Sequence, residues 1–284
     1  MSYQDTSCNT TLDIVAPISL RQSDCDHPRD IRKFTAREIR KGMHPDDLWD
    51  VNPKDNRLLN ALPETDYRRL LSDLKPVSMK RDTILSEYYR GSQYVYFPTS
   101  SLLSLMRDSA DGSSSEIAVI GNDGMVGIMA CLGGESNFTR ILVSTGGYGM
   151  CLPKQRLTEE FQRGGALQKL MLHYAQALMA QMSQTAVCNR HHSIAQQLCR
   201  RLLSSIDRLP DNELTMTHEA LAHTLGVRRE SVTMAAGKLQ QDGLIEYWRG
   251  RIVVTDRTAM EKQVCECYAC LKGECERLFP TSVH

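Results

Sequence analysis

The sequence contains no uninterrupted apolar run that approaches the ~20 residues of a membrane-spanning helix. Its first residues, MSYQDTSCNT, are polar and lack the apolar region of a signal peptide, so we expect a cytoplasmic protein. Lys+Arg and Asp+Glu are both 34, so the net charge is zero and any basic surface must be local. The sequence also lacks G-x-S-x-G, P-loop and H-E-x-x-H motifs, and paired carboxylates framed by a Gly-rich loop. We therefore do not expect an enzyme.

The N-terminal part of the chain predicts an extension followed by a β-rich domain. Residues 1–52 lack apolar periodicity, and we interpret them as a mobile extension with one short helix near Thr35–Lys41. Residues 53–163 begin with two short helical segments separated at Pro63 and continue as short β-prone runs between Gly, Asn, Asp and Ser residues. Such runs are typical of an antiparallel sandwich or barrel. The clearest hairpin signals are Asp111-Gly112 and Asn122-Asp123-Gly124.

A long helix is expected over residues 164–188. Its apolar residues recur at spacings of 4, 3, 4 and 4 and form one stripe between Ala166 and Val187. The stripe consists of Leu167, Met171, Tyr174, Leu178 and Met182. At 1.5 Å per residue the helix would be about 33 Å long, and no short neighbouring segment could cover it. We therefore predict that this stripe is the interface of a homodimer.

Residues 189–262 contain two short helical patterns separated by a sharp turn. The first pattern follows Thr217, a good N-cap, and ends at Gly226, which can adopt the left-handed conformation of such a turn. The second runs from about Arg229 to Asp242 and begins with exposed basic residues. Two strand-like segments follow, Leu244–Trp248 and Arg251–Thr255. A helix-turn-helix followed by a β-hairpin predicts a winged helix.

A winged helix of this kind is expected to bind double-stranded DNA. The first residues of the second helix are expected to contact base edges in the major groove. There, arginine can hydrogen-bond guanine and glutamate can hydrogen-bond cytosine. Arginines on the wing are expected to contact phosphates. The alternative is a helical hairpin with a purely structural role, whose arginines lie on a solvent-exposed face. The β-hairpin that follows favours DNA binding over this alternative. The candidate DNA-binding residues are Thr217, Arg228, Arg229, Glu230, Ser231, Thr233, Lys238, Arg249 and Arg251.

The chain from about Asn56 to Lys262 resembles the Crp/Fnr family of bacterial transcription regulators, most specifically in MTHEALAHTLGVRRESVTMAAGKLQQDGLI. The resemblance implies an α+β protein with an antiparallel, cyclic-nucleotide-binding-like β-roll, a long dimerisation helix and a C-terminal winged helix. It also implies a homodimer that binds operators with inverted half-sites and contacts RNA polymerase. Arg229 and Glu230 match the family's base-reading pair, and Thr217 matches a backbone-contacting threonine. Met234 stands where a further base-reading arginine is common, so the target sequence is expected to differ.

The resemblance also implies an effector pocket in the β-roll, with Val126, Gly127, Ile128 and Arg140 as candidate residues. In the family's cyclic-nucleotide site, a glutamate after a glycine binds the ribose, and an Arg-Ser or Arg-Thr pair binds the phosphate. Here Ile128 follows Gly127, and Asn137-Phe138 occupies the second position. A buried phosphate without a cation is costly, so we do not expect cyclic-nucleotide binding, and the effector stays unknown. A β-roll that acts only as a protein-interaction module is a further alternative.

The C-terminal segment 263–284 contains four of the ten cysteines in the pattern C-x-C-x2-C-x4-C: Cys265, Cys267, Cys270 and Cys275. Such thiols could bind zinc or an iron–sulfur cluster, or sense redox state. On one continuous helix, however, Cys265 would lie about 160° from Cys267, and Cys275 about 140° from Cys270. We therefore expect a packed helix with inert thiols, with a metal or redox sensor as the alternative. His191 and His192 point in different directions and are expected to cap or pack the hinge between two helices.

Overall fold

In the computed structural model of this chain, residues 51–86, 92–110, 112–133 and 139–279 are described. They all belong to one compact unit, Phe34–His284. The expected mobile extension, residues 1–52, lies outside the described residues except for its last two, and so does the short helix expected near Thr35–Lys41. None of the described helices is both long and apolar enough to cross a membrane.

Three short helical elements open the described chain: η3 (Pro53–Asp55), α2 (Arg57–Asn60) and α3 (Glu64–Leu71). α2 and α3 are separate, as expected, and Pro63 is the N-cap of the second. The buried side chain of Asn56 accepts backbone hydrogen bonds at the start of α2. Its amide group also donates to the carbonyl oxygens of Pro98 and Gly124, both at 2.8 Å, and so fastens these helices to the strands that follow.

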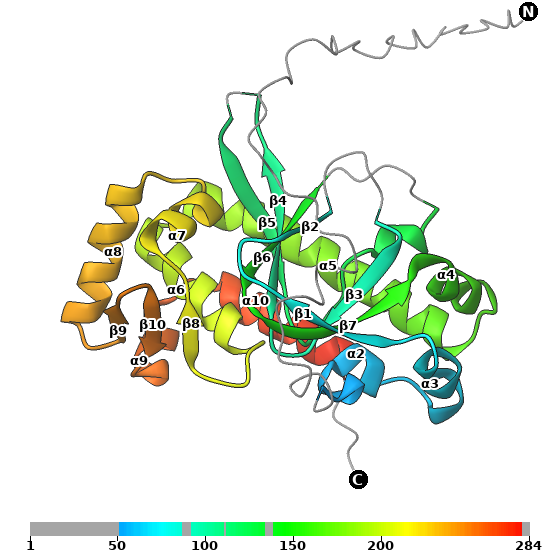
Figure 1. Ribbon diagram of the computed structural model, residues 1–284. Helices are drawn as coiled ribbons and strands as arrows, with labels where there is room; N and C mark the ends of the chain where they lie inside the picture. The colour runs from blue at the N-terminus through cyan, green and yellow to red at the C-terminus, as the bar shows by residue number, and fades with distance from the viewer. Residues whose placement is uncertain (1–50, 87–91, 111, 134–138, 280–284) are drawn as a thin grey trace, which may run out of the picture. The chain divides into compact units, whose positions relative to one another are not determined.

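Seven described strands follow: β1 (Lys75–Met79), β2 (Ile84–Ser86), β3 (Tyr94–Pro98), β4 (Leu102–Asp108), β5 (Ser114–Ile120), β6 (Arg140–Thr145) and β7 (Gly147–Pro153). They form two antiparallel sheets with the strand orders β1-β7-β3 and β2-β6-β4-β5 (Figure 1). One apolar core includes residues of both sheets, such as Phe97 of β3 and Val143 of β6. The antiparallel β-roll that the sequence predicts is therefore confirmed.

Only one of the two expected hairpins is present. β4 and β5 pair across a turn that contains Gly112, whose φ of 84° lies in the left-handed region. The prediction of a hairpin at Asn122-Asp123-Gly124 is wrong, because β5 pairs with no described strand other than β4. The chain instead turns tightly and forms a bridge from Val126 to Tyr96 before the short helix η4 (Ile128–Ala130). The apolar side chains after the turn enter the core rather than begin a paired strand.

Two helices follow the β-roll: α4 (Lys154–Gln162), which the sequence analysis did not predict, and α5 (Ala166–His191). The expected dimer stripe of α5 is buried within the chain itself. Leu167, Met171, Tyr174 and Leu178 are all less than 9% exposed and belong to the β-roll core, and Met182 packs against that core. Their assignment to the dimer interface is therefore wrong. Helical periodicity identifies an apolar stripe, but it does not reveal whether the same chain or a second subunit covers it.

The opposite side of α5 carries a second set of apolar side chains. Leu172, Met179 and Val187 are 46%, 58% and 46% exposed. These three residues, called the α5 outer face below, are the apolar surface that α5 leaves accessible in a single chain.

The predicted winged helix is present: α6 (Ile194–Ile206), β8 (Glu213–Thr215), α7 (His218–Leu225), α8 (Arg229–Gln241), β9 (Ile245–Trp248) and β10 (Arg251–Val254). β8, which was not expected, completes a three-stranded sheet with the order β8-β10-β9. The apolar side chains on the facing sides of α7 and α8 are buried: Leu221, Ala222, Leu225, Val232, Ala235, Ala236 and Leu239. A second apolar core, separate from that of the β-roll, therefore holds the two helices of the helix-turn-helix together.

The C-terminal segment 263–284 contains one helix, α10 (Cys267–Leu278), as expected, and a further short helix that was not expected, α9 (Arg257–Gln263), precedes it. The helix breaks at Val264, which has extended backbone angles and caps α9. Tyr268 and Leu271 are buried, so α10 is the packed helix that the sequence predicts. α10 packs along α5, as the red and green helices in Figure 1 show.

Candidate nucleic-acid interface and ligand cavity

The exposed tip of α8 is built by the turn that precedes it. Gly226 ends α7 with a φ of 65°, and the N–H of Val227 donates to the carbonyl of Ala222 at 3.0 Å. Arg228 then caps α8 with extended backbone angles. The buried side of α8 fixes the direction of the helix, so Arg228, Arg229 and Glu230 are exposed together at its first turn. This surface, called the α8 tip below, has the residue types and the position expected for contact with base edges.

Polar contacts fix α7 against α8 beside this tip. Thr217 caps α7 as predicted, since its hydroxyl accepts a hydrogen bond from the N–H of Ala220 at 3.1 Å. Thr233 donates to the carbonyl of Arg229 at 3.1 Å, and its Oγ1 also lies 3.1 Å from Nδ1 of His218. The imidazole of His218 stacks on Tyr247 of the wing, with ring centroids 4.1 Å apart. Burial, with a smaller contribution from the charge of Arg229, lowers the pKa of His218.

The other candidate DNA-binding residues differ in whether their charged side chains already form an ion pair within the protein. Arg249, at the wing tip, has a φ of 48° and lies over the exposed ring of Trp248, 4.6 Å from its centroid. Lys238 pairs with Asp242 at 2.8 Å near the far end of α8. Arg251 pairs with Glu213 at 2.5 Å on the sheet. Ser231 is half-buried in the first turn of α8.

Two exposed residues on this side were not among the candidates. Met234, 77% exposed on α8, and Trp248, 61% exposed at the wing, are apolar side chains on a surface that otherwise carries charge. Trp248 ends a predicted strand beside a turn, so its sequence position was the available signal.

A cavity of about 420 Å³ lies in the β-roll, against α5. Val126, Gly127 and Ile128 line it, as the sequence analysis expects, and Leu178 and Met182 close it from the side of α5. Gly127 adopts a φ of 101°, and an added Cβ would lie 2.7 Å from the side chain of Val95, so the loop can approach β3 only without a side chain here. The charged side chains among the lining residues are Arg107 and Lys154, and the remaining wall is mainly apolar.

Arg140 does not line this cavity, although we expected it to do so. It pairs with Asp108 at 3.0 Å and lines a separate crevice of about 310 Å³ together with Thr217 of α7. Its neighbours Thr139 and Ile141 line the cavity, because successive side chains of a strand point to opposite sides. Asn137-Phe138, at the second position of the family's cyclic-nucleotide site, lies outside the described residues.

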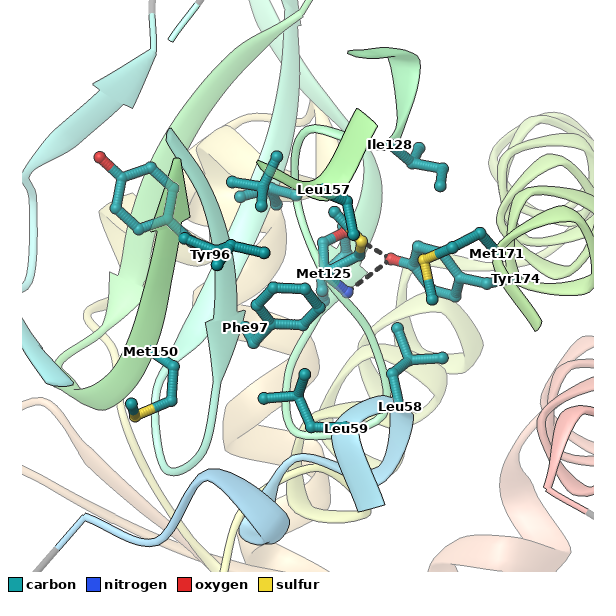
Figure 2. Packing of buried hydrophobic residues seen from close by; sticks show 14 of the residues in the cluster. Leu58, Leu59, Tyr96, Phe97, Met125, Ile128, Met150, Leu157, Met171 and Tyr174 are labelled. Carbon is teal, nitrogen blue, oxygen red and sulfur yellow. Dashed lines mark hydrogen bonds between the residues drawn. The ribbon is translucent and has the colours of Figure 1, made fainter. Parts of the chain in front are cut away.

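Tyr174 connects α5 to the loop that lines the cavity. Its hydroxyl donates to the carbonyl of Met125 at 2.6 Å and accepts from the N–H of the same residue at 3.0 Å, as the dashed lines in Figure 2 show. Burial raises the pKa of Tyr174, so this hydroxyl keeps its proton at neutral pH. Met125 also lines the cavity, so a movement of this residue would be transmitted to α5 through its hydrogen bonds with Tyr174.

Two ion pairs connect the β-roll with α6 and the turn after it. Nε of Arg201 lies 2.7 Å from Oε1 of Glu116, and both side chains are buried. Nε of Arg208 lies 2.8 Å from Oδ2 of Asp123, and each of these side chains is 11% exposed. Burial lowers the pKa of Arg201, while the charge of Glu116 opposes that change. Sequence patterns do not reveal these pairs, because the partners in each are 85 residues apart.

The structure separates the four C-terminal cysteines. Cys265 and Cys267 are buried beside Cys188 and His192, whereas Cys270 is exposed and Cys275 lies near Asp123. Burial raises the pKa of the Cys265 thiol to about 12, and the adjacent Cys188 adds to the rise. The expectation that the four cysteines of the tail do not converge is therefore confirmed. The expectation that His192 only packs or caps is incomplete, since its Nδ1 lies 3.4 Å from Sγ of Cys267.

Comparisons with known proteins agree with this arrangement. Residues 196–263 match the family model for the Crp-like helix-turn-helix domain. The global nitrogen regulator of Synechocystis sp. is 22% identical over 209 residues, which are 69% of this chain and 93% of that protein.

Solved structures of similar fold extend the likeness to the β-roll. FixK2 from Bradyrhizobium japonicum has a TM-score of 0.57 and 13% identity, over 68% of this chain and 98% of that chain. A transcriptional regulator of the CRP/FNR family from Thermus thermophilus has a TM-score of 0.51 and 18% identity, over 66% of this chain and 97% of that chain. The chain therefore carries a Crp-like helix-turn-helix domain at residues 196–263 and has the fold of transcriptional regulators of the CRP/FNR family.

Proposed function

We propose that the chain is a homodimeric, sequence-specific DNA-binding regulator whose β-roll binds an effector. The observation that carries this proposal is the α8 tip, where three charged side chains project from a helix whose other side is fully packed. A helical hairpin used only for packing has no need for such a rigid charged end. Acting on DNA and RNA polymerase, the protein would work in the cytoplasm.

The α5 outer face is the proposed dimer interface, in place of the stripe that the β-roll covers. Leu172 and Met179 are seven residues apart and Val187 follows eight residues later, so they lie along one side of the helix. Two such helices can pack against each other with these apolar side chains between them. A two-fold dimer would present two α8 tips to inverted half-sites about 34 Å apart.

We further propose that the effector is a small, largely apolar molecule rather than a cyclic nucleotide. The cavity is walled mainly by apolar side chains, and Ile128 occupies the position where a carboxylate would bind a ribose. Arg140, which could have replaced the missing phosphate-binding cation, lies in the other crevice and is paired with Asp108.

Selection of DNA sites from a random duplex library by the full-length protein tests the proposal. We expect an inverted-repeat consensus and an affinity that falls steeply as salt concentration rises. Absence of any salt-dependent duplex binding would favour the alternative in which the β-roll and winged helix serve only protein interactions.

A further inference from the structure

Four metal-binding side chains from distant parts of the chain meet where α5, α6 and α10 join. The residues, called the Cys3His cluster below, are Cys188, His192, Cys265 and Cys267. Their potential ligand atoms all lie within 4.8 Å of one another, and the three cysteines are buried. Cys188 is in the last turn of α5, His192 caps that helix, and the other two flank the start of α10.

Two distances within this cluster match those expected around a single tetrahedral metal ion. Sγ of Cys188 lies 3.7 Å from Sγ of Cys265, and Sγ of Cys267 lies 3.4 Å from Nδ1 of His192. Tetrahedral zinc with Zn–S bonds of about 2.3 Å and Zn–N bonds of about 2.0 Å separates two sulfurs by about 3.8 Å, and a sulfur from a nitrogen by about 3.5 Å. An iron–sulfur cluster binds its thiolates at different iron atoms and spreads them further apart. The close spacing therefore favours one ion.

A second set of contacts orients the possible ligands. Nε2 of His192 lies 3.2 Å from a carboxylate oxygen of Glu266, which leaves Nδ1 directed at the cluster. A histidine that binds a metal through one nitrogen commonly donates from the other to a carboxylate in this way. The side-chain amide of Gln184 donates to Sγ of Cys267 at 3.0 Å, a contact that would stabilise a thiolate.

The buried cation Arg200 supplies an independent argument from charge. It is 5% exposed, and its Nε donates to Sγ of Cys188 at 3.1 Å. Among the contacts of the described residues, this is the one polar contact of its side chain. A buried guanidinium is costly unless it faces a negative charge, and neutral thiols do not provide one. Three thiolates, a neutral imidazole and one divalent ion together carry a charge of −1, which would balance Arg200.

We propose that the Cys3His cluster binds one zinc ion. Three cysteines and one histidine are an established ligand set for closed structural zinc sites, and thiolate and imidazole ligands in tetrahedral geometry suit zinc. Binding releases the three thiol protons, so the affinity for zinc rises with pH. The ion would fasten the start of α10 to the hinge between α5 and α6, and thus set how the winged helix follows the long helix. This inference is independent of DNA binding and of the identity of the effector.

Metal analysis of the purified full-length protein tests the site. We expect one zinc per chain, and less than a tenth of that in the double variant Cys265→Ser/Cys267→Ser. Cys270→Ser, on the same helix but exposed, and Cys199→Ser, buried in the other core, are matched controls that should keep the zinc. Reconstitution of zinc-free protein with cobalt(II) should give the visible absorption of tetrahedral cobalt–thiolate coordination, and the double variant should lack it.

A variant outside the ligand set tests the zinc site even if the cysteine variants fail to fold. The side chain of Glu266 is 73% exposed, so Glu266→Gln should fold normally. Competition with a chelator should show a zinc affinity about 10- to 100-fold lower than that of the unchanged protein, the effect typical of second-shell changes. The proposal is overturned if the purified chain holds no zinc, if Cys188 and Cys265 form a disulfide in place of metal binding, if iron is the metal bound, or if the double variant keeps its zinc.

Discussion

Arg229 and Arg249 are both exposed arginines of the winged helix, but they differ in what surrounds them. Arg229 belongs to the α8 tip, where its Nε has only a loose contact with Glu219 at 3.9 Å. Arg249 is held at the wing tip by its stacking on Trp248. On the proposed function, the first residue would read a base and the second would contact a phosphate.

Substitution of these two arginines should have different effects. Arg229→Ala should weaken binding to the preferred site by about 1–3 kcal/mol and relax the consensus at one position. Arg249→Ala should weaken binding to all sequences alike and reduce the slope of log affinity against log salt by about one unit. Site selection and salt titration of each variant would measure this, with the exposed Arg68→Ala on α3 as a control. A changed consensus for Arg249→Ala alone would reverse the assignment.

Tyr174 provides a second prediction that concerns a single residue. Tyr174→Phe removes both hydrogen bonds to the buried backbone of Met125 and should lower the free energy of unfolding by about 1–3 kcal/mol. Tyr148→Phe is a suitable control, because its hydroxyl has no hydrogen-bond partner among the residues that the structure describes. Denaturant unfolding of the two variants measures the difference, and equal stabilities would contradict the role given to Tyr174.

Local features of the helix-turn-helix could be predicted from the sequence. The cap at Thr217 and the left-handed turn at Gly226 depend on the backbone within a few residues, and both are confirmed. Arg140 was assigned to the wrong side of its strand, because a one-residue change of register reverses the direction of every side chain.

Among the elements, α5 has two apolar sides that the sequence pattern does not distinguish by function. One packs on the β-roll and closes the cavity, and the other is exposed. A spacing pattern shows only that α5 has an apolar stripe. Whether the β-roll or a second subunit covers that stripe depends on the tertiary structure. The C-terminal helix was predicted, but its start was not, because Val264 has extended backbone angles and α10 begins only at Cys267.

The two sides of α5 should respond differently to a buried charge. Met179→Glu, on the outer face, should leave the chain folded but raise the dimer dissociation constant about 10-fold or more, since burying one such side chain contributes about 1.5–3 kcal/mol. Met171→Glu, at a position 2% exposed, should unfold the β-roll instead. Sedimentation equilibrium and circular dichroism separate the two outcomes, with Gln162→Glu at an exposed position of α4 as a control. A stable Met179→Glu dimer would assign the interface to another surface.

At the scale of the whole molecule, long-range pairs join parts that the sequence describes separately. The pair of Glu116 and Arg201 and that of Asp123 and Arg208 connect the β-roll to α6 and the turn after it. Composition and periodicity contain no information on such partners, and the same reason explains why His192, 75 residues from Cys267, was not assigned to a metal site.

Removing only one partner of the buried ion pair between Glu116 and Arg201 should strongly destabilise the fold. Glu116→Ala leaves the guanidinium of Arg201 buried without its partner and should lower the free energy of unfolding by about 3–5 kcal/mol. The double variant Glu116→Leu/Arg201→Met removes both charges and should recover most of that loss. Denaturant titrations of the single and double variants measure the difference. Equal losses for both would mean that packing rather than charge determines the cost.

The composition of the cavity wall leads to a prediction about ligands. Isothermal calorimetry with cyclic AMP should give no saturable binding with a micromolar dissociation constant, because neither Ile128 nor the paired Arg140 can replace the missing polar groups. Small apolar molecules in the same assay should bind and release heat. Tight binding of cyclic AMP would instead point to Arg107 and Lys154 at the cavity wall.

The turn of the helix-turn-helix lies directly against the β-roll. A side chain at Gly226 would collide with Ser115 of β5, and Ile117, two residues further along the same strand, lines the cavity. An effector in the cavity and DNA at the helix-turn-helix would thus both contact elements that pack on β5. Thermodynamic linkage then requires that each ligand change the affinity of the protein for the other equally. If an effector changes the affinity for DNA 5- to 150-fold, the range of about 1–3 kcal/mol found for such coupling, DNA must change the affinity for the effector by the same factor. Operator DNA added to a ligand screen would therefore reveal which weak binders are effectors, since only their affinities would shift.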